Sequence, residues 1–170
     1  HHYVKISDTL IQNFKSSITY YMNKNLHHHQ HHQILWSRTW EVLYDYVQHM
    51  RQDKIQEVLS ELPLTWLNQR QPWYGHPLWK GRSIGGEILI KSAQYNQVQL
   101  IRTLIEKYDV DPFYISPKME MEQHKELNYT CSAFSTACFY QCFDVVKYFV
   151  ESKLLMLHDK LKFDSSNLLE

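Results

Sequence analysis

The chain has 170 residues, of which 44% are hydrophobic and 21% are charged, and this composition fits one folded domain rather than a disordered segment. No apolar run approaches the roughly 20 residues that a membrane-spanning helix needs. The 18 basic side chains balance the 18 acidic ones, which argues against nucleic acid or an acidic membrane as the partner.

The first predicted element is an amphipathic helix within residues 1–21. Its apolar side chains recur at helical spacing, and we expect the helix to cap the open N-terminal end of the fold. These side chains are Val4, Leu10, Ile11, Phe14, Ile18 and Tyr21.

Residues 22–33 are rich in His and Gln, and we expect them to form a flexible linker. Because imidazole binds Zn²⁺, Ni²⁺ and Cu²⁺, the same segment is a candidate metal site. A polar tract without a metal role is the alternative. The histidines concerned are His27, His28, His29, His31 and His32.

Gly and Pro divide the rest of the chain. All four Gly lie between residues 75 and 86, and the five Pro lie at 63, 72, 77, 112 and 117. These two residues are the strongest breakers of regular structure. The segments free of both should therefore be helical, and they are 34–62, 87–111 and 127–158.

Each of these segments is predicted to hold two short helices joined by a tight turn. In the middle segment, apolar residues at helical spacing stop at Ala93 and resume at Leu100. Leu43, Leu89 and Phe134 are equivalent positions, so the pattern recurs after 46 and 45 residues. Such repetition predicts a solenoid, in which each helix pair buries its apolar face on its neighbours.

The third segment resembles a repeat of the ankyrin family. Its "CSAFSTAC" is similar to the family pattern G-x-T-P-L-H-x-A-A, and "DVVKYFVE" is similar to the V-V-x-x-L-L second helix. The middle segment is similar through "LIRTLIE" and "DVDP"; the first matches less closely. The resemblance implies an all-α, ankyrin-like helical repeat solenoid: three divergent repeats over residues 34–156, with long inter-repeat loops. Residues 157–170 would then be a tail or the start of a further repeat.

The turns between paired helices depart from the family pattern. Ankyrin repeats often have Gly there, and this chain has Met50, Asn96 and Gln141. A residue other than Gly costs roughly 1 kcal/mol in the left-handed conformation, which Asn tolerates better than most. We therefore expect repeats that are divergent or that turn differently.

The third segment also contains the three cysteines, Cys131, Cys138 and Cys142. We expect them to be reduced and mostly buried as small apolar residues, in an intracellular and cytoplasmic protein. A zinc or redox site is the alternative, although zinc usually takes four ligands. The apolar pairs 145–146 and 149–150 are predicted to form the buried stripe of the second helix.

No sequence motif supports a catalytic mechanism. The stretch "GRSIGG" lacks the Lys-Ser/Thr of a phosphate-binding loop, and neither a nucleophile elbow nor a kinase signature is present. We therefore expect no enzymatic activity and no cofactor.

The strongest functional signal is the loop over residues 64–86. It combines large aromatic side chains with basic ones and contains no acid, and aromatic residues and Arg dominate the energetics of protein interfaces. The ankyrin resemblance implies binding through hairpin tips and the inner face of the first helices. The predicted partner-binding residues are Trp66, Arg70, Trp73, Tyr74, Trp79 and Arg82. The alternative is that some of the Trp side chains pack under the loop as a small core of their own.

The sequence thus predicts a non-enzymatic scaffold or adaptor that binds another protein and does not insert into a membrane. Nucleic acid is not the expected partner. The alternatives are a metal-binding protein that acts through the His-rich segment and the non-catalytic region of a larger enzyme.

Overall fold

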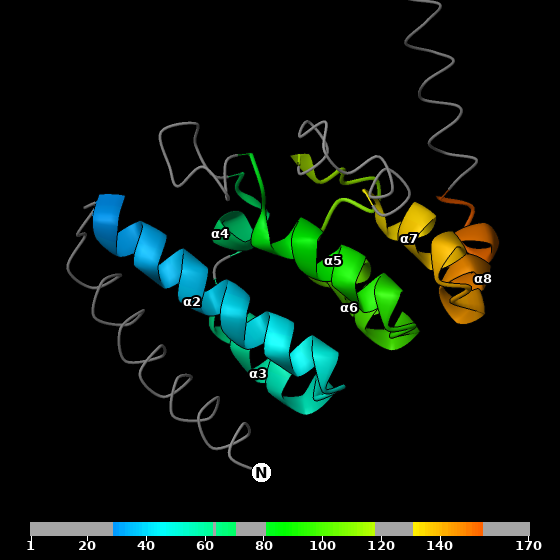
Figure 1. The fold of residues 1–170 in the computed structure, drawn as a ribbon, viewed down its shortest axis with the longest axis horizontal. Helices are drawn as coiled ribbons and strands as arrows, with labels where there is room; N and C mark the ends of the chain where they lie inside the picture. Colours follow the sequence, from blue (N-terminus) through cyan, green and yellow to red (C-terminus); the bar gives the residue numbers. More distant parts are fainter. Residues whose placement is uncertain (1–28, 63, 71–80, 118–130, 155–170) are drawn as a thin grey trace, which may run out of the picture. The chain divides into compact units, whose positions relative to one another are not determined.

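The computed structural model describes residues 29–62, 64–70, 81–117 and 131–154. Within these ranges the regular structure is helical and contains no strand, so this part of the chain is all-α, as predicted. The predicted N-terminal helix and the tail after residue 156 lie outside the described residues. The helices in Figure 1 are α2 (His29–Gln48), α3 (Gln52–Glu61), α4 (Leu64–Asn68), α5 (Ile84–Gln94), α6 (Val98–Glu106), α7 (Ala133–Phe139) and α8 (Phe143–Glu151).

The chain divides into two compact units, with the boundary between Ile88 and Leu89 inside α5. The first unit contains α2, α3, α4 and the beginning of α5. The second contains the end of α5 followed by α6, α7 and α8.

In the first unit α3 packs along α2 (Figure 1). Leu43 and Val47 of α2 and Ile55 and Leu59 of α3 are completely buried, as their spacing predicted. The helix α2 begins at His29, so residues 29–33 are helical and the prediction of a linker is wrong for them. The tract contains neither Gly nor Pro, and nothing in its backbone therefore interrupts a helix that continues into residues 34–48.

In the second unit α8 packs against both α7 and α6. Val145 and Phe149 are completely buried and Tyr148 is nearly so, but Val146 is only half-buried and Val150 is 56% exposed. The predicted stripe is therefore wrong in half of its members. Each residue turns a helix by 100°, so the residue that follows a buried position lies at the edge of the buried face or outside it.

The first turn of α7 is capped by its own serines. The Ser132 side chain accepts a hydrogen bond from the Ser135 backbone N–H, and the Ser135 hydroxyl accepts one from the Ser132 N–H, both at 3.2 Å. This reciprocal capping box satisfies two N–H groups that a helix start leaves unpaired. Ser132 therefore sets the first residue of α7.

The same turn joins α2 to α3, α5 to α6 and α7 to α8. Met50, Asn96 and Gln141 each have a φ of 55°. In each turn the next residue's N–H donates to a carbonyl five residues earlier, at 2.8–2.9 Å. The left-handed residue itself donates to the carbonyl three residues earlier, at 3.1–3.3 Å. This is the Schellman arrangement. Of the two alternatives, divergent repeats or a different turn, the different turn is not observed: the chain keeps one turn geometry and places residues other than Gly in it.

Replacing Gln141 by glycine is expected to raise the free energy of unfolding by about 1 kcal/mol, because glycine adopts a positive φ without steric cost. Urea denaturation followed by circular dichroism measures the change. Asn96→Gly is the control: it removes the bond from Asn96 Nδ2 to Asp144 Oδ2, 3.0 Å long, and should gain less. A Gln141→Gly protein that is less stable than the parent would contradict the observed turn.

Candidate interaction site

The base of the predicted binding loop is closed by a hydrogen bond. Arg70 Nη1 donates to the carbonyl oxygen of Gly81 at 2.8 Å, and Gly81 has a φ of 73°, a left-handed value. This contact joins the two ends of the segment 71–80. Arg70 itself is exposed, and its guanidinium closes the loop; its contact with a partner stays a prediction.

Arg82 is buried and does not face a partner, so its prediction as a partner-binding residue is wrong. Its Nε lies 3.2 Å from Glu87 Oε1, and the two side chains are only 9% and 7% exposed. The loop 64–86 contains no acidic residue, but Glu87, which pairs with Arg82, is the next residue in the sequence. Because a buried charge needs a partner, Arg82 holds the chain at the beginning of α5 instead of facing a ligand.

Ser83 also stabilises the beginning of α5 through two hydrogen bonds. Its hydroxyl accepts a hydrogen bond from the Gly86 N–H at 3.0 Å, and its carbonyl accepts one from the Glu87 N–H at 3.1 Å. These bonds serve the N–H groups of the first turn of α5, where the negative charge of Glu87 is also favourable. The C-terminal end of the loop is thus held by a cap and by an ion pair.

The hydrogen bonds and the ion pair at the ends of the loop do not test the predicted contact role of its four aromatic residues. Trp66 lies in α4, but its side chain lies outside the described residues, and so do Trp73, Tyr74 and Trp79. Their contact role stays a prediction. Of the candidate metal ligands, His29, His31 and His32 lie in α2 without described side chains, and the other two precede the described residues.

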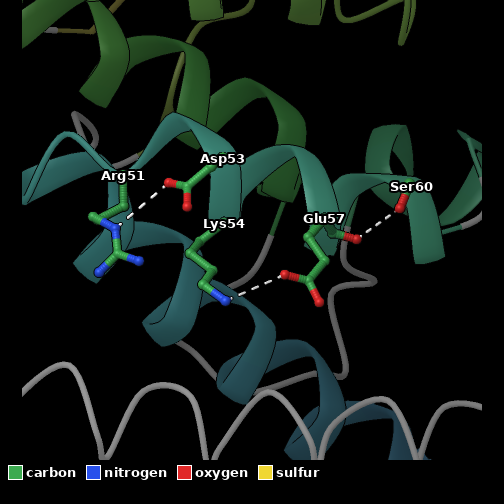
Figure 2. Close-up of polar contacts among 5 residues, drawn as sticks. All are labelled: Arg51, Asp53, Lys54, Glu57 and Ser60. Carbon is green, nitrogen blue, oxygen red and sulfur yellow. Dashed lines mark hydrogen bonds and ion pairs between the residues drawn. The ribbon is translucent and has the colours of Figure 1, made fainter.

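A polar face runs along α3 (Figure 2). Arg51 Nε lies 3.5 Å from Asp53 Oδ1, Lys54 Nζ lies 3.5 Å from Glu57 Oε2, and the Ser60 hydroxyl donates to the Glu57 carbonyl at 2.7 Å. Partial desolvation opposes ionisation of Asp53, but the Lys54 backbone N–H and the Arg51 side chain outweigh it and hold the pKa of that carboxyl below its usual value. Exposed pairs of this kind contribute little binding or stability, so we interpret this face as solvated.

Three aromatic side chains that the sequence analysis passed over are exposed around the turn between α7 and α8. Phe139 is 53% exposed, Tyr140 45% and Phe143 73%. The rings of Phe139 and Tyr140 meet edge to face with their centroids 5.1 Å apart. The signal was present in the sequence: Phe143 is two residues before the buried Val145, and helical periodicity places it on the opposite side of α8.

Polar contacts connect α8 to the α5–α6 pair within the second unit. The Tyr148 hydroxyl donates to Glu106 Oε1 at 3.2 Å, and the Arg102 guanidinium lies 5.3 Å from the centre of the Tyr148 ring. Burial, together with the charge of Glu106, raises the pKa of Tyr148. Asn96, the left-handed residue of one turn, donates to Asp144 in the first turn of α8. These contacts fix the side of α8 that faces α6.

The three cysteines are free thiols in different environments. Cys142 is buried, its thiol donates to the Gln94 carbonyl at 3.5 Å, and burial followed by the charge of Asp144 raises its pKa. Cys131 is half-buried and Cys138 is exposed, so the prediction that all three are mostly buried is wrong for Cys138. That residue lies near the C-terminal end of α7 and outside its buried face, which Ala133, Thr136 and Ala137 form.

Neither a metal centre nor a membrane segment is found in the described part of the chain. No three His, Cys, Asp or Glu side chains there are grouped so that they could hold a metal ion. None of the helices there has the combination of length and apolar character that crossing a membrane requires. Comparison of the chain with protein-family models, with curated proteins and with solved structures finds no match.

Proposed function

We propose that the chain is a helical repeat module, built of divergent repeats like those of the ankyrin family, that binds another protein and has no catalytic activity of its own. The observation that carries the proposal is the recurrence of one turn at Met50, Asn96 and Gln141, after 46 and 45 residues. A shared turn at a nearly constant period is typical of repeat architectures.

Packing within the second unit supports the same interpretation. The helices α6 and α8 are the second members of consecutive pairs, and they pack against each other. Stacking of equivalent helices is how a repeat protein buries its apolar faces. Such proteins serve mainly as extended binding surfaces, and a reducing cytoplasmic location would suit the three free thiols.

Within this proposal the loop over residues 70–81 carries the partner contacts. The Arg70–Gly81 hydrogen bond and the Arg82–Glu87 ion pair hold its two ends, which lowers the entropy that the loop loses on binding. Trp73 and Trp79 are the proposed anchors.

Trp73→Ala and Trp79→Ala are each expected to weaken partner binding by at least about thirtyfold, corresponding to about 2 kcal/mol. Chemical cross-linking in the native source followed by mass spectrometry measures which proteins are lost from the wild-type set. Tyr140→Ala is the matched control, since Tyr140 is an exposed aromatic residue of the second unit and its truncation should leave that set intact. Unchanged cross-linking together with a lower melting temperature would show that the tryptophans are core residues, and the proposed contact surface would be wrong.

A further inference from the structure

We draw no further inference here: the strongest candidate, the exposed apolar patch that Phe139, Tyr140 and Phe143 form around the turn between α7 and α8 and that Val150 continues along α8, carries nothing, because nothing in the described part of the chain shows what covers it.

Discussion

Replacing Glu87 by alanine is expected to lower the free energy of unfolding by about 3–5 kcal/mol. The substitution removes the carboxylate that lies 3.2 Å from Arg82 Nε, and it leaves the arginine charge in a site where the side chain is only 9% exposed. A domain of ordinary size has only about 5–15 kcal/mol of stability in total. The loss should therefore be evident as an earlier midpoint in urea denaturation followed by circular dichroism.

Two variants separate this effect from a general sensitivity to charge removal. Glu57→Ala breaks the pair with Lys54 in the same unit, where the two side chains are 38% and 29% exposed, and it should cost at most about 1 kcal/mol. The double change Arg82→Met with Glu87→Leu should recover much of the loss, because it removes both buried charges together. Equal effects of Glu87→Ala and Glu57→Ala would contradict the buried ion pair.

Introducing aspartate at Val145 is expected to cost about 4 kcal/mol or more, since it places a charge in a completely buried site of α8. The variant should lose its cooperative thermal transition or become insoluble. Val145 packs in the helix that contacts both α6 and α7, so the damage should extend through the second unit. Thermal unfolding followed by circular dichroism, on the soluble fraction, measures the effect.

Val150→Asp is the matched control in the same helix. Val150 is 56% exposed, and substitutions at exposed positions usually change stability by no more than about 0.5 kcal/mol. If Val150→Asp proves as damaging as Val145→Asp, the assignment of the inner and outer faces of α8 is wrong.

The helix pairs were predictable because their signal is local. Paired helices formed largely within the segments free of Gly and Pro, although α5 includes Gly85 and Gly86. Apolar residues at helical spacing in α2, α3 and α6 became the core, as Leu43, Ile55 and Leu104 illustrate. The turn positions were also predictable from the interruption of the pattern. That Met50 and Gln141 adopt the left-handed conformation was not, because the packing of the two paired helices outweighs a local preference of about 1 kcal/mol.

The loop shows where sequence reasoning reached its limit. Its aromatic content marks the segment 64–86 as a candidate surface, and Arg70 is exposed at one end of it. Arg82 looked equivalent to Arg70 in the sequence. Only the folded chain brings it beside Glu87, since the burial of two charges depends on the three-dimensional path of the backbone at the start of α5.

The sequence by itself determined the all-helical character of the described residues and the positions of the three turns, because these depend on residues within a few positions of one another. The tertiary structure alone decided which face of α8 is buried. The four apolar positions 145–146 and 149–150 span an arc of about 140° around the helix, and periodicity cannot choose which part of that arc is buried. Contacts with α6 and α7 bury Val145 and Phe149 and leave Phe143 and Val150 facing outward, because a helix can turn only one side toward its neighbours.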